Sequence, residues 1–394
     1  MGHAFDTFFG AGRSGRPCVL LVSHNAMRTG APLTLLWLAQ AIAGTGRFDV
    51  RIVVHGGGPL VEDFARVAPL CVAADHATRL GISASDVPDR IAAAFGALTP
   101  RGLAVCNTVA VPAYNAAFMN AGVDVLTWIH ELPAFFDAEQ MGLIVRSSRY
   151  VGVYSEWNRA RFTGVYAIPN DKLVIAPPVT PHLSRTIPSD EERRAARQAI
   201  GIPEDAFMVL GVGYVHLIKG SDLFVQIAAR CVRLCKDVAH PLAFRWIGGD
   251  ADSISRRVVS NDIVALKLGD VVSFPGPQPD PWPWYRAADV FACTSRWEAM
   301  GLSVLEAMSC GLPVISFAGA GAARFITEPR DVLPSLDVDA FSQRITAYLN
   351  DPGLRARNGE AAHRRVLAEF GDGTLAPGLM AVLDDLAQRA ERLE

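Results

Sequence analysis

The stretch that decides the fold is DVFACTSRWEAMGLSVLEAMSCGLPVISFAG, residues 289–319. It begins with an apolar run, passes through a loop into a segment of helical character, and reaches a second apolar run after Gly311 and Pro313. Two short apolar runs joined through a helix are typical of parallel strands in one sheet. Glu298 and Glu306 lie eight residues apart in the middle of this stretch, and they bracket the predicted start of the helix.

This helix start is a predicted anion site. Ser303, with Glu306 three residues later, has the form of a capping box, which places the first free backbone amides between Gly301 and Leu305. Free amides and the helix dipole favour a negatively charged group, so one glutamate could face a sugar and the other a ribose. The alternative is that Glu306 only completes the cap and Glu298 is an ordinary loop acid. The spacing alone leaves both readings open.

The same alternation of apolar runs and helical stretches extends outward in both directions. It indicates an α/β fold with doubly wound parallel sheets covered on both faces, and it is interrupted once, near Pro177–Pro181. We predict a flexible N-terminal tail at 1–16, two Rossmann-like domains at 17–180 and 181–370, and a C-terminal helix at 371–394 that packs on one of the domains. Ligands of such sheets bind at the carboxyl ends of the strands, so two facing domains would enclose a central cleft.

Composition excludes several classes of protein. The 394 residues include 37 basic and 40 acidic side chains, for a net charge of −3, which disfavours binding to nucleic acid through a basic patch. The N-terminal segment lacks the features of a secretion signal, so we expect a soluble, cytoplasmic protein. The seven cysteines lie mostly in apolar runs, which predicts buried free thiols. Cys231 and Cys235 lack nearby ligands that would complete a metal site.

Lys219 is a second candidate site residue. It follows the apolar strand 209–215 and precedes Gly220 and Ser221, and Ser221 is a good N-cap for the next helix. A lysine between the carboxyl end of a strand and a helix start is well placed to contact phosphate. The alternative is an ordinary surface lysine.

Three further features follow predicted strands. His130 ends the run 124–130 and is either a hydrogen-bonded core residue or a group that faces the ligand. Gly30 lies in the first strand-to-helix loop and either makes the turn or lets the backbone approach a ligand. Gly319 and Gly321 imitate a dinucleotide fingerprint, but Arg324 occupies the place of the third small residue, which argues against a nicotinamide enzyme.

Together these residues resemble glycosyltransferase family 4, whose retaining enzymes have the GT-B architecture. The resemblance covers the chain from about Cys18 to Phe370, and its most specific part is SRWEAMGLSVLEAMSCGLPVI, which matches the Glu-x7-Glu element of the family. The stretches GYVHLIKGSDLF, DVFACTS and WIHELP add independent support. By this resemblance the first domain would receive the acceptor and the second would bind the nucleotide sugar.

The resemblance also implies roles for individual residues. Glu298 would contact the hydroxyls of the donor sugar, Glu306 the nucleotide ribose, and Lys219 the diphosphate. His130 would lie by the anomeric carbon, and Glu298, His130 and Lys219 form the expected catalytic set. The remaining residues expected to bind the nucleotide sugar are Gly30, Gly213, Tyr214, Gly301, Leu302 and Ser303.

One departure from the family pattern concerns Tyr214. Members of the family often have arginine at this position, five residues before the phosphate-binding lysine. The loss of a preorganised donor to developing charge commonly costs about 10²–10³ in rate, so we expect a substitute. Arg28, Arg296 and His216 are the candidates. Met300 stands where many relatives have phenylalanine, which conserves bulk.

The resemblance implies a metal-independent retaining hexosyltransferase that moves a sugar from a UDP- or GDP-linked donor to an acceptor hydroxyl, without a cofactor. The expected acceptor is a sugar, a lipid-linked saccharide or a growing polysaccharide in bacterial polysaccharide or glycoconjugate synthesis, with peripheral contact at the inner face of the membrane as an option. Two alternatives remain: a catalytically weak nucleotide-sugar-binding subunit that acts with a partner, and a GT-B nucleotide-sugar epimerase. The donor base, the acceptor and the oligomeric state are not determined by the sequence.

Overall fold

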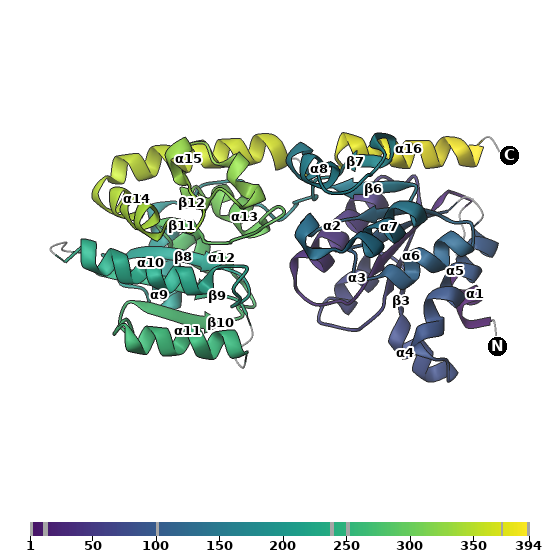
Figure 1. Cartoon of the computed structure of the whole chain (residues 1–394), viewed down its shortest axis with the longest axis horizontal. Helices are drawn as coiled ribbons and strands as arrows, with labels where there is room; N and C mark the ends of the chain where they lie inside the picture. Colours follow the sequence, from purple (N-terminus) through teal and green to yellow (C-terminus); the bar gives the residue numbers. More distant parts are fainter. Residues whose placement is uncertain are drawn as a thin grey trace. The chain divides into compact units, whose positions relative to one another are not determined.

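The structure is a computed structural model that describes residues 3–10, 15–99, 102–236, 240–249, 253–371 and 373–391 (Figure 1). Its contacts divide the chain into two compact units. The N-terminal unit comprises Met1–Pro181 together with Gly373–Glu394, and the C-terminal unit comprises His182–Asp372.

The N-terminal unit is built on a seven-stranded parallel sheet within the described residues, with strand order β3-β2-β1-β4-β5-β6-β7. Its strands are β1 (Cys18–Ser23), β2 (Asp49–Val54), β3 (Leu70–Val72), β4 (Leu103–Asn107), β5 (Asp124–Trp128), β6 (Tyr150–Val153) and β7 (Leu173–Ile175). Its helices are α1 (His3–Gly10), α2 (Gly30–Gly44), α3 (Val61–Val67), α4 (Ala73–Leu80), α5 (Val87–Leu98), α6 (Pro112–Asn120), α7 (Ala138–Ser147), α8 (Glu156–Thr163) and α16 (Pro377–Glu391). The central strands are buried along their whole length, as expected for a sheet covered on both faces.

The C-terminal unit repeats this architecture with a six-stranded parallel sheet in the described residues, ordered β10-β9-β8-β11-β12-β13. Its strands are β8 (Phe207–Val212), β9 (Leu242–Ile247), β10 (Val272–Gly276), β11 (Val290–Cys293), β12 (Val314–Phe317) and β13 (Val332–Leu333). Its helices are α9 (Asp190–Ile200), α10 (Ser221–Leu234), α11 (Ile254–Ala265), α12 (Trp282–Ala287), α13 (Leu302–Ser309), α14 (Val338–Asn350) and α15 (Pro352–Phe370). A core between this sheet and helices α10 and α14 includes Phe224, Trp246 and Phe341.

Both sheets reverse their winding direction at one point, between β1 and β4 in the N-terminal unit and between β8 and β11 in the C-terminal unit. In open α/β sheets, ligands bind outside the carboxyl ends of the strands at such a switch point. The predicted doubly wound α/β fold is confirmed. The loops that follow these four strands are therefore the places to look for a site.

The N-terminal segment differs from the expected loose tail. Residues His3–Gly10 form helix α1, which packs against α5, whereas residues 1–2 and 11–14 lie outside the described part. Phe5 and Phe9 are buried in the core of the N-terminal unit. The apolar side chains in AFDTFF explain the difference, because their burial in the core favours an ordered helix over a loose tail.

The C-terminal helix α16 belongs to the N-terminal unit, where it contacts β7 (Figure 1). Its apolar face is buried through Leu379, Val382, Leu383 and Leu386. Within the described residues, no helix is both long and apolar enough to cross a membrane. All seven cysteines are free and buried, which confirms the prediction of buried thiols.

The packing of α1 generates a stability prediction. Phe9 is 1% exposed, and its ring centroid lies 5.4 Å from that of Phe95. We expect Phe9→Ala to cost about 3–5 kcal/mol in the N-terminal unit and to lower its melting temperature by roughly 10 °C. Circular dichroism melting checks this, with Phe9→Leu as the milder control. A shift of less than about 2 °C for the alanine variant would mean that α1 does not pack as described.

Candidate functional site

Lys219 and Glu298 meet at the switch point of the C-terminal sheet. Lys219 lies in the loop after β8 and Glu298 in the loop after β11, and the Lys219 ammonium forms an ion pair with Oε2 of Glu298. The side chains are 30% and 17% exposed, respectively. The sequence predicted both residues at this edge of the sheet, and the structure brings them into direct contact.

The backbone around Lys219 explains this position. Gly220 is in the left-handed conformation, with φ 71°, and it is the N-cap of α10. A Cβ atom on Gly220 would lie 2.0 Å from the carbonyl oxygen of Thr294, so the two loops can approach only through a glycine. The Thr294 hydroxyl donates to the carbonyl oxygens of Lys219 and Gly220 at 3.1 and 2.9 Å. The expectation that Ser221 caps the helix is wrong, because Gly220 does so.

Burial and charge act in opposite directions on Lys219. Removal from water tends to lower the pKa of its ammonium, but the Glu298 carboxylate outweighs this effect and raises the pKa. Lys219 is therefore charged at neutral pH. The pair places an ammonium and a carboxylate side by side at the carboxyl edge of the sheet.

Helix α13 starts beside this pair, but not with the predicted cap. Its N-cap is Gly301, in the left-handed conformation with φ 81°, and no side chain caps it. The predicted capping box is therefore wrong. Ser303 lies inside the first turn, and Glu306 faces other partners. The amides of Leu302 and Ser303 are the first of the helix and have no preceding turn to donate to, so the predicted anion site remains in place.

Glu306 is held by two aromatic side chains. Its Oε2 accepts a hydrogen bond from the Tyr285 hydroxyl at 2.5 Å, and its Oε1 lies 3.1 Å from Nε2 of His182. Burial raises the pKa of Tyr285 well above its usual value, and the neighbouring carboxylate raises it further. The tyrosine thus stays protonated and donates. A carboxylate has about four acceptor positions, so Glu306 keeps capacity for further donors.

The glycine-rich loop after β12 supports Glu298. The amide of Gly321 donates to the carbonyl oxygen of Glu298 at 2.6 Å, and a Cβ atom on Gly321 would lie 2.2 Å from the carbonyl oxygen of Ala299. A Cβ atom on Gly319 would similarly lie 2.6 Å from the carbonyl oxygen of Arg296. These glycines therefore allow close contact between two loops of the protein.

The loop that contains Tyr214 is partly exposed to solvent. Tyr214 is 53% exposed. The carbon stem of Lys219 lies over Gly213, where a Cβ atom would be 3.5 Å from it, and the Gly213 carbonyl accepts from the Trp246 indole at 2.9 Å. Gly213 therefore supports the lysine, while Tyr214 supplies no positive charge that would replace an arginine.

Two of the three side chains that could substitute for the missing arginine already form ion pairs. Arg296 forms a two-pronged pair with Asp222, at 2.8 and 2.7 Å, and also donates to the carbonyl of Leu217. Arg28 pairs with Asp63 at 3.1 Å in the N-terminal unit. His216 lies in the Lys219 loop, where its Nδ1 accepts from the amide of Ile218 at 3.2 Å. Arg296 is thus a structural tie between two loops.

A second polar cluster lies at the carboxyl edge of the N-terminal sheet. His130 follows β5, and its Nδ1 contacts the hydroxyl of Tyr154 while its Nε2 lies 2.5 Å from Oδ1 of Asn107. The Asn107 amide nitrogen donates to the carbonyl of Ala31 at 2.9 Å, next to Gly30 at the start of α2. In this arrangement Nε2 carries the proton and Nδ1 accepts from Tyr154.

This cluster holds His130 neutral. Burial, followed by the nearby His24 ring, lowers the pKa of His130 to about 3. Burial also lowers the pKa of His24, whose Nδ1 is buried without a hydrogen-bond partner among the described residues. Next to them, Thr108 has φ 72°, which is unusual for a residue with a branched Cβ atom, and its hydroxyl donates to Glu131 at 2.5 Å. Backbone strain of this kind gathers at functional sites.

Comparison with known proteins now identifies the C-terminal unit. Residues 192–365 match the family described as Glycosyl transferases group 1. These residues resemble a group 1 glycosyltransferase domain. The predicted resemblance to glycosyltransferase family 4 is thereby confirmed.

Individual relatives agree with this assignment. The chain is 33% identical over 190 residues to a D-inositol 3-phosphate glycosyltransferase of Kribbella flavida, covering 47% of this chain and 45% of the relative. It is 32% identical over 247 residues to one of Acidothermus cellulolyticus, covering 60% and 54%. The chain thus spans about half the length of the curated relatives that it matches.

Solved structures extend the likeness to nearly the whole chain. The HepE protein of Anabaena, crystallised with UDP-glucose, superimposes with a TM-score of 0.76 at 17% identity, covering 95% of this chain and 99% of HepE. Sucrose-phosphate synthase from Thermosynechococcus elongatus gives a TM-score of 0.71 at 20% identity, covering 96% and 99%. At these identities the likeness concerns the fold, and the fold is GT-B.

Four side chains that surround the predicted residues in the two units were not indicated by the sequence. Tyr285 and His182 hold Glu306, and Asn107 and Tyr154 hold His130. Asn107 and Tyr154 each lie at the end of a predicted strand, so their positions gave a usable signal. Tyr285 and His182 come from a helix and a connecting segment, and no sequence pattern pointed to them.

The histidine cluster of this GT-B protein generates the next prediction. We expect Tyr154→Phe to leave the pKa of His130 far below the ordinary 6.5, because burial and the nearby His24 ring lower it and the substitution removes neither. Nitrogen-15 NMR of the histidine side chains measures both the pKa and the tautomer. Wild type should keep the Nε2-protonated form down to about pH 5. A His130 ring that titrates near pH 6.5 in the wild type would contradict the structure.

Proposed function

We propose that the protein is a retaining glycosyltransferase that moves a sugar from a nucleotide-diphosphate sugar to an acceptor hydroxyl. The observation that carries this proposal is the Lys219–Glu298 ion pair beside the uncapped start of α13, at the switch point of a group 1 glycosyltransferase domain. An ammonium, free amides and a carboxylate in one place match the charges of a diphosphate and the hydroxyls of a sugar.

On the donor side, the diphosphate would lie against the Lys219 ammonium and the amides of Leu302 and Ser303. Bond breaking at the anomeric carbon places charge on the leaving diphosphate, and these fixed donors stabilise that charge most in the transition state. Glu298 would accept from the hydroxyls of the donor sugar. In this account the helix start and the lysine supply the positive field, so no metal ion is needed.

The nucleotide would be held by its ribose. Glu306 has both carboxylate oxygens oriented, one by Tyr285 and the other by His182, and a ribose diol can donate to the acceptor positions that remain. A carboxylate fixed by two partners loses little entropy on binding. This arrangement supports the role that the family resemblance implied for Glu306.

The neutral state of His130 bears on the proton transfer. Both ring nitrogens already have partners, so the ring is a poor base, and we assign it to positioning near the sugar, with Gly30 at the adjacent helix start. The acceptor proton would then go to an oxygen of the departing diphosphate. The anomeric carbon loses its bond to that diphosphate and gains one to the acceptor oxygen on the same face, which retains the configuration.

One solved structure and two relatives support a more specific donor and acceptor class for the proposal. HepE was crystallised with UDP-glucose, which supports UDP over GDP as the donor nucleotide. The relatives from Kribbella and Acidothermus are named for D-inositol 3-phosphate, which supports a polyol phosphate as one acceptor class beside the saccharides expected from the sequence.

A second candidate function has one observation in its favour. Tyr214 replaces the expected arginine, and both Arg296 and Arg28 are held in ion pairs. A domain that binds the nucleotide sugar but lacks this charge would turn over slowly and act through a partner protein. Binding without turnover is the outcome that would favour this candidate.

The first experiment is a calorimetric screen of UDP, GDP, ADP and their glucose conjugates, followed by product analysis with saccharide and inositol phosphate acceptors. We expect UDP and UDP-sugars to bind in EDTA, and we expect the UDP-sugar to be converted to UDP only when an acceptor is present. A strict requirement for divalent metal would contradict the proposed donor site. Conversion of the donor in the absence of acceptor would instead indicate the epimerase.

The role of Glu298 has a separate test. Glu298→Gln removes the sugar-facing carboxylate, and we expect it to lower kcat about 10–10²-fold, the scale of losing hydrogen bonds to a charged group, with UDP binding retained because Lys219 remains. The loss of its carboxylate partner should also lower the pKa of Lys219. The matched control is Glu360→Gln on an exposed face of α15, where the carboxylate is 59% exposed. Near wild-type turnover in the Glu298 variant would rule out this role.

A further inference from the structure

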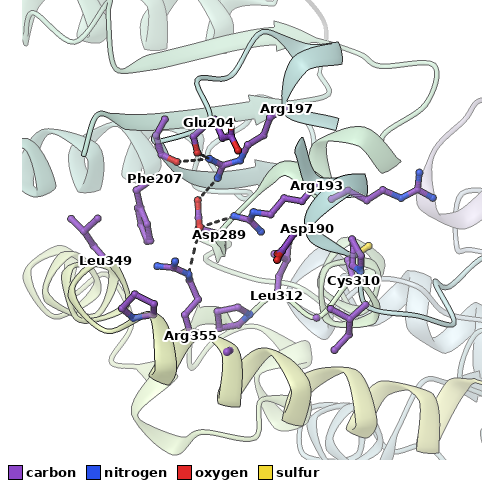
Figure 2. A pocket seen from close by; sticks show the side chains of 18 of the residues that line it. Asp190, Arg193, Arg197, Glu204, Phe207, Asp289, Cys310, Leu312, Leu349 and Arg355 are labelled. Carbon is purple, nitrogen blue, oxygen red and sulfur yellow. Dashed lines mark hydrogen bonds and ion pairs between the residues drawn. The ribbon is translucent and has the colours of Figure 1, made fainter. Parts of the chain in front are cut away.

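A separate cavity lies at the opposite edge of the C-terminal sheet, at the amino ends of its strands. It has a volume of about 520 Å³ and opens between helices α9 and α15 (Figure 2). Phe207, at the start of β8, and Asp289, just before β11, lie on its wall. Lys219 and Glu298 follow the carboxyl ends of these same strands, so the cavity is not part of the site described above.

Three arginines converge on one carboxylate in this cavity. Arg193 and Arg197 of α9 each bind Asp289 at 2.6 Å, and Arg355 of α15 approaches it at 3.4 Å. Figure 2 shows their guanidinium groups pointing toward Asp289 from opposite sides. The Asp289 side chain is only 5% exposed, and its Oδ2 also accepts from the amide of Met208 at 2.8 Å.

The cluster carries more positive than negative charge. One buried carboxylate contacts three guanidiniums. Burial lowers the pKa of Arg193, and the neighbouring Arg197 and Arg355 lower it further, against the opposing effects of Asp289 and Asp190. The acidic residues at the rim, Asp190, Glu204 and Asp205, are exposed to water, where charges are screened. The interior of the cavity therefore favours an anion.

The three arginines differ in how many of their N–H donors have no acceptor. Arg197 has at most one donor left, since besides Asp289 it donates to the backbone carbonyls of Ala287, Glu204 and Ala206. Arg193 adds one bond, to Ala288, and Arg355 adds one, to Tyr348. A guanidinium has five N–H donors, so both keep donors that no described residue accepts. Their side chains are 30% and 25% exposed, and a ligand can reach them.

The geometry suits a phosphate group. Arg193 and Arg355 both contact the same oxygen of Asp289, Oδ1, so their guanidiniums lie close enough for one tetrahedral anion to bridge them, and guanidiniums bind phosphate in a two-pronged manner. The cavity is larger than a phosphate ion. Part of the remaining wall is apolar and is formed by Phe207, Leu312, Pro313, Leu349 and Pro352, while His240 and Arg286 also line the cavity.

We propose that this cavity binds a small organic phosphate monoester, with its dianion between Arg193 and Arg355 and its organic part against the apolar wall. The site is independent of the proposed transferase reaction. A phosphorylated metabolite and free inorganic phosphate share the anion, and they differ in whether the apolar wall contributes.

The test is titration calorimetry with phenyl phosphate and with inorganic phosphate, at low ionic strength and pH 8, where both are dianions. We expect phenyl phosphate to bind one-to-one and more tightly than inorganic phosphate. Arg355→Gln should weaken the binding at least about tenfold. Asp289 keeps Arg193 and Arg197 in this variant, so the fold should persist, and Arg355→Lys is the milder alternative, which keeps the charge but loses the two-pronged contact.

Two control variants test whether the phosphate binds in this cavity and not elsewhere in the protein. Lys219→Ala disables the proposed diphosphate site and should leave the binding unchanged. Arg364→Gln removes the same charge from α15 at a position that is 70% exposed, and it should also have no effect. The proposal is overturned if neither probe binds saturably, if inorganic phosphate binds more tightly than phenyl phosphate, or if Lys219→Ala rather than Arg355→Gln abolishes binding.

Discussion

The ion pair between Lys219 and Glu298 is the interaction on which the candidate site depends. A lysine that is largely withdrawn from water is costly unless a carboxylate lies beside it, and this carboxylate comes from the neighbouring strand's loop. The contact requires the loop after β8 to touch the loop after β11, which only a glycine at position 220 permits. The tie between Arg296 and Asp222 and the bond from Gly321 to Glu298 hold the same loops from either side. The site is thus rigid before any ligand arrives, which favours binding to developing charge.

The fold was predictable because it follows from the alternation of apolar runs and helical stretches along the sequence. Buried parallel strands are continuous apolar runs, and residues 289–319 contain two of them around one helix. Single helix boundaries were less predictable. Ser303 and Glu306 satisfied the pattern of a capping box, yet Gly301 took the cap position because a left-handed residue was needed where the loop turns beside Ala322. The helix α1 was missed because AFDTFF is too short to show a period, and its burial depends on packing against α5.

The site residues were predictable to the extent that they follow strands. Lys219, Glu298 and His130 stand at strand ends, so the parallel sheet places them at one edge of their unit. Their partners were not predictable, because the contact between His182 and Glu306 spans 124 positions in the sequence. Such contacts depend on how segments pack, and no local pattern records them. The same holds for Asp289, which looks like an ordinary residue before a strand and is the meeting point of three arginines from two helices.

The return of the last helix to the first unit has a consequence for synthesis on the ribosome. The N-terminal unit is discontinuous, and α16, which contacts β7, is made only after the whole of the second unit. Domains generally fold in the order of their synthesis, but here the first unit remains incomplete until the second has already emerged. During that interval β7 is an uncovered edge strand, the kind of surface that pairs with other chains. Rapid docking of α16, or a chaperone that shields this edge, would therefore limit aggregation of the nascent protein.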